Sequence, residues 1–167
     1  MNFTTRFAQS TLKDFTIVYE CRFDDSASKM FGDTTIPTFE THCQWMKEQV
    51  LKKRSTFIIA CDHLGDFGFV RFAKGRHSPD YKDVLGSIPN IWFVSIAVLP
   101  SHRSRGLGYE ILKASEEKFI TQELERPITL LTWARSDNPP SWRIFEKANW
   151  NRNFIEGYRE VAIRTIS

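Results

Sequence analysis

The residues best suited to chemistry in this chain form a short basic loop, Arg103-Ser104-Arg105-Gly106-Leu107-Gly108. An apolar run rich in β-branched residues, Ile91 to Val98, precedes the loop, and an amphipathic pattern follows it. The first amides of a helix lack partners within the helix and carry the positive end of its dipole. Glycine lets the backbone approach a phosphate with a positive φ, and arginine adds charge. The loop therefore predicts a site for the phosphate or pyrophosphate of a cofactor.

The sequence of the loop excludes two familiar classes of phosphate-binding loop. A Walker A loop ends in Gly-Lys-Ser/Thr, whereas Tyr109-Glu110 follows the last glycine here. A Rossmann loop needs a third glycine at the position of Ile111. The pattern that remains is Arg-x-x-Gly-x-Gly, preceded by Val-x-Pro at Val98 to Pro100.

A second segment, Asn138 to Trp150, follows a strand-like run at Ile128 to Ala134. Together with the loop, it resembles motifs A and B of the GNAT superfamily of N-acetyltransferases, and the two motifs cover roughly the C-terminal half of the chain. The second motif is carried by Asn138, Ser141, Phe145, Lys147, Asn149 and Trp150.

Patterns of apolar residues predict the order β-α-α-β-β-β-α-β-α-β-β along the chain. Thr38 is the expected N-cap of the second helix, and the first helix is expected to bury Leu12, Phe15, Tyr19 and Phe23. The resemblance implies the GNAT fold, an α/β arrangement in one acetyltransferase domain over residues 1–167. That fold has a single mixed, mostly antiparallel sheet of about seven strands with splayed central strands, and about four helices.

The resemblance also implies acetyl-CoA (coenzyme A) as the cofactor. Its pantetheine arm is expected to pair with the backbone of Ile96, Ala97 and Val98, and an N–H of Ile96 or Ala97 to polarise the thioester carbonyl. Backbone amides from Arg103 to Tyr109 and the arginine side chains are expected to hold the pyrophosphate. The cofactor contacts expected in the loop are Arg103, Ser104, Arg105, Gly106, Leu107, Gly108 and Tyr109, and those in the second motif are Asn138, Ser141, Phe145 and Lys147.

Two catalytic groups common in the superfamily are replaced in this chain. Phe145 stands where relatives have a tyrosine that protonates the leaving sulfur, so Ser141, Tyr158 or water would have to serve. Phe93 stands where many relatives have a glutamate base. Proton removal is then expected through water and backbone carbonyls or a side chain of the N-terminal half, and Ser95 could order that water.

The acceptor half carries a weaker signal. Glu40-Thr41-His42-Cys43-Gln44-Trp45 resembles a Glu-x-His-x-x-Trp helix of the branch that acetylates amino-sugar nucleotides, and also of the ribosomal-protein and aminoglycoside branches. The Trp-Arg-Asn of those relatives reads Cys21-Arg22-Phe23 here. His42 and Trp45 share a helix face, aromatic rings stack on bases, and arginine reaches phosphate. Core packing is the alternative for the same side chains. The expected acceptor contacts are Arg22, Met30, Phe31, His42 and Trp45.

The composition of the chain limits the partners and the cellular locations that can be expected. The chain has 167 residues, 41% of them hydrophobic, and a net charge of +3. This charge suits an anionic small ligand as well as nucleic acid, and we expect no nucleic-acid partner. Three scattered cysteines and the lack of a signal peptide or a long apolar run predict a cytoplasmic protein with no metal site, disulfide framework or membrane span. A monomer or a homodimer is expected.

The resemblance implies an enzyme that transfers an acetyl group from acetyl-CoA to a primary amine of a small molecule, such as an amino-sugar nucleotide, by direct attack in a ternary complex. Three alternatives stay open. The acceptor could be a peptide or ribosomal-protein N-terminus, although no strong acidic cluster suggests a groove for it. The chain could be a catalytically weak acyl-CoA-binding module, because Phe145 lacks a hydroxyl. A nucleic-acid binder would use Arg103 and Arg105 and would show steep salt dependence.

Overall fold

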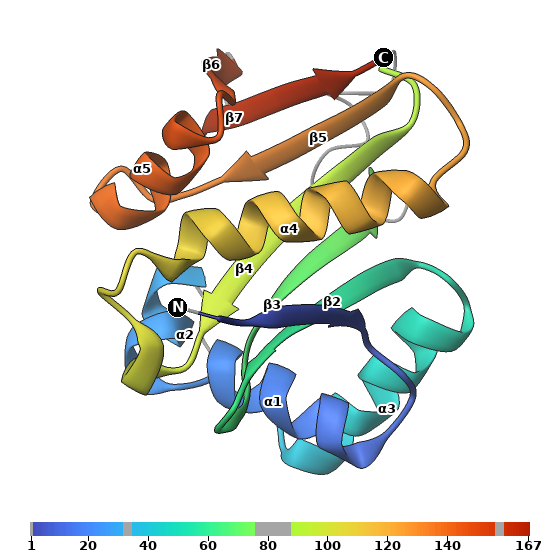
Figure 1. Ribbon diagram of the computed structural model, residues 1–167, viewed down its shortest axis with the longest axis vertical. Coiled ribbons are helices and arrows are strands. Elements are labelled where there is room, and N and C mark those ends of the chain that lie inside the picture. Colours follow the sequence, from blue (N-terminus) through green and yellow to red (C-terminus); the bar gives the residue numbers. More distant parts are fainter. Residues whose placement is uncertain (1, 32–34, 76–87, 156–158) are drawn as a thin grey trace.

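The computed structural model describes residues 2–31, 35–75, 88–155 and 159–167 of the chain. These residues form a seven-stranded sheet in the order β1-β2-β3-β4-β5-β7-β6, with helices packed against it (Figure 1). The strands are β1 Thr4–Phe7, β2 Ser55–Asp62, β3 Gly65–Lys74, β4 Ile91–Val98, β5 Ile128–Trp133, β6 Asn151–Ile155 and β7 Arg159–Ile166. The helices are α1 Leu12–Arg22, α2 Asp25–Phe31, α3 Phe39–Leu51, α4 Leu107–Gln122 and α5 Pro139–Lys147, with a 3₁₀ turn at Pro100–His102.

The central strands β4 and β5 diverge, as the resemblance implied. They are the parallel pair of a sheet whose other pairs are antiparallel, and they pair from Ile91–Phe93 to Thr129–Leu131. Strand β4 continues to Val98 along β3 without β5 beside it. The hydroxyl of Thr132 donates to the carbonyl of Val94 at 2.8 Å, at the point where the gap begins.

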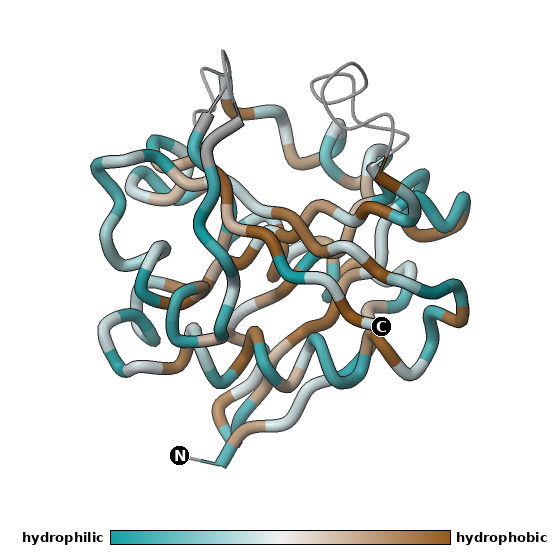
Figure 2. Tube along the Cα trace, turned by 90° about the horizontal axis from the view of Figure 1, so that it is seen from above, coloured by the Kyte–Doolittle hydropathy of each residue, from teal (hydrophilic) through white to brown (hydrophobic). Residues whose placement is uncertain are grey.

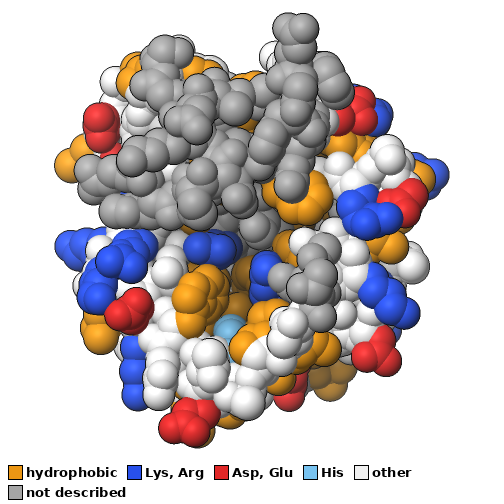
Figure 3. Space-filling model, turned by 180° about the vertical axis from the view of Figure 1, so that it is seen from behind, with side chains coloured by type: hydrophobic (Ala, Val, Ile, Leu, Met, Phe, Trp, Pro, Cys, Tyr) orange, Lys and Arg blue, Asp and Glu red, His pale blue; other side chains and the backbone are white. Residues whose placement is uncertain are grey.

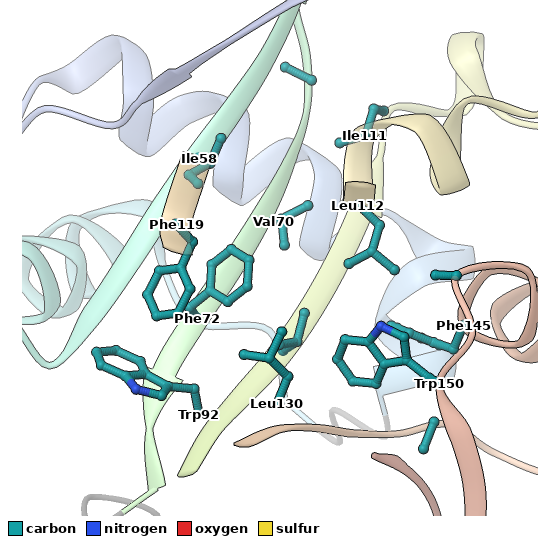
Figure 4. Close-up of a cluster of buried hydrophobic side chains, with 14 of the residues drawn as sticks. Ile58, Val70, Phe72, Trp92, Ile111, Leu112, Phe119, Leu130, Phe145 and Trp150 are labelled. Atoms are coloured by element: carbon teal, nitrogen blue, oxygen red, sulfur yellow. The ribbon is translucent and has the colours of Figure 1, made fainter. Parts of the chain in front are cut away.

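Alternation along β3 divides the core between the two faces of the sheet. Phe72 packs with α4, where its ring stacks on Phe119 at 4.1 Å between centroids (Figure 4). Phe69 points the other way and packs with Phe15 of α1 and Phe57 of β2. Figure 2 shows hydrophobic residues concentrated along the central strands and hydrophilic residues at the outer turns. Burial of these two faces fixes the sheet between α4 and the pair α1 and α3.

The helix termini follow from local side chains. The hydroxyl of Thr38 accepts from the amide of Thr41 at 3.2 Å, which confirms Thr38 as the N-cap of α3. Helix α2 was not expected, because its segment is rich in turn-forming residues. The carboxylate of Asp24 accepts from the amide of Ser26 at 3.0 Å and from that of Ala27 at 3.4 Å. Asp24 therefore caps this short helix, which brings the helix count among the described residues to five rather than about four.

Within the described residues, no helix is both long enough and apolar enough to cross a membrane. The cysteines Cys21, Cys43 and Cys61 are all free thiols. Burial raises the pKa of the Cys21 thiol to about 12. No cluster of three or more His, Cys, Asp and Glu side chains in the described ranges is arranged to hold a metal ion.

Candidate active site

The gap between β4 and β5 is part of a cavity of about 740 Å³. Residues expected to bind the cofactor and residues expected to bind the acceptor line this one cavity, although they come from opposite halves of the sequence. From the cofactor set, the lining residues are Ile96, Ala97, Val98, Arg103, Gly108, Asn138, Ser141 and Phe145, and from the acceptor set they are Arg22, Met30, Phe31 and Trp45. Ser95, expected to order a water molecule, lines it too.

The N-terminus of α4 carries unsatisfied amides. Gly106 is the N-cap with φ of 74°, and no side chain caps the helix. Ser104 also has a positive φ, 58°, so the loop turns back sharply before the helix. Ser104, Arg105 and Gly106 are exposed, whereas the side chain of Leu107 is in the core. The loop thus presents backbone N–H groups, an exposed arginine and the helix dipole at one surface point, an arrangement that suits a pyrophosphate.

The side chain of Arg103 is engaged elsewhere than expected. Its guanidinium pairs with the carboxylate of Asp24, its Nη1 also donates to Ser26, and its Nε donates to the carbonyl of Val98 at 2.9 Å. This pairing holds the pKa of Asp24 well below its ordinary range. In this structure the side chain thus ties the loop to α2, and its expected contact with the pyrophosphate stays a prediction.

Helix α5 places the second motif beside α4. The side chain of Asn138 accepts from the amide of Ser141 at 3.4 Å and caps the helix. The ring of Phe145 is buried against Trp150, with 5.0 Å between ring centroids. A Cβ on Gly108 would meet the Ile144 side chain at 2.5 Å, so the first turn of α4 lies directly against α5.

Like Ser104, Arg105, Gly106 and Leu107 of the loop, the expected cofactor contacts Tyr109 and Lys147 are not part of the cavity lining. The ammonium of Lys147 stands over the ring of Tyr109 at 4.0 Å and lies 4.0 Å from the carboxylate of Glu110. These side chains join the outer surfaces of α4 and α5 beside the basic loop. Asn149, at the position where the motif of the superfamily has glycine, adopts a φ of 59°, a conformation that asparagine tolerates better than most residues.

On the acceptor side, Arg22 from the end of α1 stands over the ring of Phe31 from α2, with 4.5 Å between guanidinium carbon and ring centroid. Met30 is 41% exposed and borders the cavity. Trp45 from α3 lies edge-on to Phe57, with 6.0 Å between ring centroids. These four cavity residues come from three helices, and their rings and charges face one space.

His42 is not part of the cavity lining, in contrast to the expectation. His42 is only 2% exposed, and its Nε2 lies 3.0 Å from the carbonyl oxygen of Phe15. Because a carbonyl only accepts, this contact requires the proton on Nε2. The imidazole packs against four rings, those of Tyr19, Phe23, Phe39 and Trp45. It supports Trp45 from the core instead of contacting a substrate.

The burial of His42 predicts a pH effect on stability. Burial lowers the pKa of His42 below its ordinary value of 6.5. The unfolded chain therefore takes up a proton below about pH 6.5 that the folded protein does not, and stability falls as the pH drops. We expect wild type to lose more unfolding free energy between pH 7.5 and pH 5 than His42→Gln does, measured by urea denaturation. His63→Gln, at an exposed turn, serves as control and should lose as much as wild type. An equal loss in all three proteins would contradict the assignment.

Sequence reasoning missed the polar residues that α3, β3 and the turn before β2 contribute to the cavity. Arg71, an arginine in the otherwise apolar run of β3, pairs in register with Ser95 of β4. Gln49 and Arg54 border the same space, as does Lys74 at the end of β3. The sequence did offer a signal for Arg71, because it alternates with Phe69 and Ala73 on the inward face of a strand. A charged residue is rare at such a position unless it has a partner or a function.

The groups available for proton transfer are few. Ser95 and Ser141 line the cavity, and so does Phe93 at the position where relatives have a glutamate. No histidine or carboxylate belongs to the lining as far as the described residues go. Tyr158, the third candidate acid, lies outside the described residues. The described part of the cavity therefore offers hydroxyls, backbone groups and cations for proton transfer.

Comparison with known proteins identifies the family. The model of the Acetyltransferase (GNAT) family matches residues 19–150, so the chain belongs to this family. An L-2,4-diaminobutyric acid acetyltransferase of Vibrio parahaemolyticus serotype O3:K6 (strain RIMD 2210633) is 32% identical over 107 residues, which are 64% of this chain and 51% of that protein. The chain thus spans about half the length of this curated relative.

Solved structures share the fold. An aminoglycoside acetyltransferase, AAC(6')-Ib, in complex with coenzyme A superposes with a TM-score of 0.78 at 18% identity, covering 98% of this chain and 95% of that one. A spermidine N-acetyltransferase from Vibrio cholerae, bound to coenzyme A and spermine, gives a TM-score of 0.72 at 14% identity, over 98% and 94% of the chains. A phosphinothricin acetyltransferase from Sinorhizobium meliloti in complex with acetyl-CoA gives 0.69 at 17% identity, over 100% and 90%. At these identities the likeness shows the α/β fold with its seven-stranded mixed sheet.

Proposed function

We propose that this protein is an acetyl-CoA-dependent N-acetyltransferase whose acceptor is a primary amine of a small molecule. The observation that carries the proposal is the single cavity that joins the diverging end of β4 to the acceptor residues on α1, α2 and α3. Family membership supports the reaction class. A cytoplasmic location and a monomeric or homodimeric state stay part of this proposal.

The residues present fit the donor. The uncapped amides at Gly106 to Tyr109 suit its pyrophosphate, with Arg105 beside them. The unpaired length of β4 from Ser95 to Val98 suits the extended pantetheine arm, because a peptide-like chain can pair with an open strand edge. Asn138, Ser141 and Phe145 border the same space from α5.

Acetyl-CoA supplies an activated acetyl thioester to this site. We expect a backbone N–H of Ile96 or Ala97, in the part of β4 that β5 does not pair with, to stabilise negative charge on the carbonyl oxygen, an effect that typically contributes about 3 kcal/mol. The cations around the cavity disfavour an ammonium ion and so favour the neutral, attacking form of the amine. Water ordered by Ser95 would take the amine proton, and the hydroxyl of Ser141 or water would protonate the departing thiolate.

A direct test measures thiol release from acetyl-CoA in the presence of single amines, together with calorimetric titration of coenzyme A. We expect saturable binding of coenzyme A and amine-dependent thiol release. Binding without release for every amine class would support an acyl-CoA-binding module. Absence of binding would overturn the proposal.

Replacing Trp45 with alanine tests the acceptor side. Trp45 lines the cavity and covers the guanidinium of Arg71, with 4.9 Å from the guanidinium carbon to the ring centroid. We expect the acceptor KM to rise at least about tenfold, because a buried aromatic contact is lost, while the acetyl-CoA KM changes less than twofold. The control is Trp45→Phe, which keeps a ring and should lose less. A rise in the acetyl-CoA KM with an unchanged acceptor KM would place Trp45 on the donor side.

The finer identity of the acceptor is part of the proposal. An amino-sugar nucleotide is supported by the aromatic residues and arginines of the acceptor half, which suit a base and phosphates. A peptide or ribosomal-protein N-terminus is the second candidate, and it is disfavoured because no acidic side chain lines the described part of the cavity. Parallel assays with an amino-sugar nucleotide and with a peptide bearing a free N-terminus separate the two.

A further inference from the structure

Arg71 is a charged side chain held at the cavity by neutral partners. Its Nε donates to Ser55 Oγ at 3.0 Å, and its Nη2 donates to Gln49 Oε1 at 3.2 Å. Its guanidinium carbon lies 4.9 Å from the ring centroid of Trp45 and 5.7 Å from that of Phe57. Across the described ranges, no carboxylate pairs with Arg71.

This arrangement is costly without a negative partner. A guanidinium taken out of water needs a counter-charge, and hydrogen bonds to neutral groups compensate only part of the loss. Burial and the positive charge of Arg22 lower the pKa of Arg71 to about 10. Arg22 is therefore close enough to repel Arg71, and an anion beside both would relieve the desolvation and the repulsion together.

The cavity around the two arginines is cationic. Figure 3 shows Lys and Arg side chains among hydrophobic ones around the hollowed part of this face. Arg103 is neutralised by Asp24, and Arg54 has Glu48 at 3.8 Å, but Arg71 has no such partner in the described structure. The described lining residues include Arg22, Arg54, Arg71, Lys74 and Arg103 and no aspartate or glutamate.

We propose that Arg71, together with Arg22, binds an anionic group of the acceptor, so that the substrate is a primary amine that also carries a carboxylate or a phosphate. The inference rests on the proposed function and narrows its substrate class. Ser55 and Gln49 hold the guanidinium plane from one side, and its remaining N–H groups form the planar fork that matches a carboxylate or a phosphate. Arg71 lies opposite Ser95 in the sheet. An anion bound to Arg71 would therefore lie near the end of β4 where the acetyl group is expected.

This substrate class excludes acceptors that carry only positive charge. A polyamine or an unmodified aminoglycoside would bring several ammonium ions against Arg22 and Arg71, which is unfavourable. An amino acid or a phosphorylated amino sugar instead brings one negative group for the arginines and one amine for the acetyl transfer. The same cations that hold the anion favour the uncharged state of that amine.

The test compares amines that differ in the anionic group alone. The carboxylate pair is L-2,4-diaminobutyrate with its decarboxylated counterpart 1,3-diaminopropane, and the phosphate pair is glucosamine 6-phosphate with glucosamine. Each is titrated by calorimetry into protein saturated with coenzyme A, which keeps the pyrophosphate loop occupied. We expect the anionic member of at least one pair to bind roughly tenfold to a hundredfold more tightly. The pair in which the anionic amine binds more tightly shows whether the site prefers a carboxylate or a phosphate.

The variant Arg71→Gln is expected to remove this preference, while Arg71→Lys, which keeps the charge but not the fork, retains part of it. Coenzyme A affinity should stay within about twofold of wild type in both, which verifies the fold. The matched control is Lys52→Gln, an equal loss of charge at the exposed end of α3. It should leave the preference unchanged.

Two results would overturn the inference: equal or absent binding of the anionic amines in wild type, or a preference that survives in Arg71→Gln. Thiol release from acetyl-CoA is measured with the same amines. Tight, Arg71-dependent binding without thiol release would retain the anion site and refute the proposed acetyl transfer. Thiol release with equal use of both members of each pair would retain the transferase and refute the anion site.

Discussion

Replacing Gly106 with valine is expected to abolish the binding of coenzyme A, with a loss of affinity of at least about a hundredfold. Gly106 is the N-cap of α4 at φ of 74°, a conformation that costs a β-branched residue roughly 1–2 kcal/mol or more. No atom lies within 4 Å of a Cβ built there, so the valine would find open space on the protein side. The loss would come from moving the amides that face the phosphates and from blocking their approach. Calorimetric titration of coenzyme A measures it.

Gly65 offers a matched control for this change. It also has a positive φ, 131°, and apart from its chain neighbours no described atom lies within 4 Å of its built Cβ, but it is the first residue of β3, where the hairpin from β2 closes. Gly65→Val should lower stability through the same kind of backbone strain and leave coenzyme A affinity within about twofold. Undiminished affinity in Gly106→Val would show that the backbone at the start of α4 does not touch the ligand.

Replacing Glu116 with alanine is expected to lower the free energy of unfolding by about 2–3 kcal/mol. Glu116 in α4 is 2% exposed and accepts from Trp150 Nε1 at 2.8 Å and from Arg164 Nη1 at 2.6 Å. Burial raises the pKa of Glu116 despite the nearby arginine. The alanine would leave an indole N–H and a half-buried guanidinium without this partner. Urea denaturation at pH 7.5 measures the loss.

The neighbouring residue provides the control. Glu117 is exposed on the same helix, so Glu117→Ala should change the unfolding free energy by less than about 0.5 kcal/mol. Glu116→Gln keeps an acceptor for Trp150 and should fall between the two. A loss in Glu116→Ala no greater than in Glu117→Ala would mean that α4 is held to β7 by apolar packing alone.

The strands were predictable because their periodicity is local. Apolar runs bounded by turn-forming residues located β2, β3 and β4, and a threonine before a helical pattern located the start of α3. The predicted buried face of α1 was correct for Phe15 and wrong for Leu12. Leu12 is 65% exposed, whereas Asp14 is buried and accepts from Arg6 at 2.7 Å. Asp14 can be buried because Arg6, on a strand distant from the helix, pairs with it. The spacing of residues within the helix does not reveal such a partner.

The candidate site divides in the same way. The basic loop and the second motif were recognisable because contiguous residues of fixed type must hold a diphosphate. The side chain of Arg103 could not be placed, since its partner Asp24 is 79 residues away along the chain. The role of Arg71 depends on what α3 and β2 set around it, namely Gln49 and Ser55, and on the absence of a nearby acid in the described fold. Contacts between distant elements decide these roles.

The divergence of β4 and β5 also leaves part of the folded protein's hydrogen bonding to a ligand. Past Phe93, β5 no longer pairs with β4. The carbonyls of Val94 and Val98 accept from the side chains of Thr132 and Arg103, and among the described residues no strand pairs with the rest of this edge, which is therefore open to a ligand. A ligand seated along that edge acts as a surrogate strand. Because it binds the folded form and not the unfolded one, its concentration sets part of the folding equilibrium. A ligand that binds along this open edge of β4 would therefore raise the folded fraction of the protein as its concentration rises.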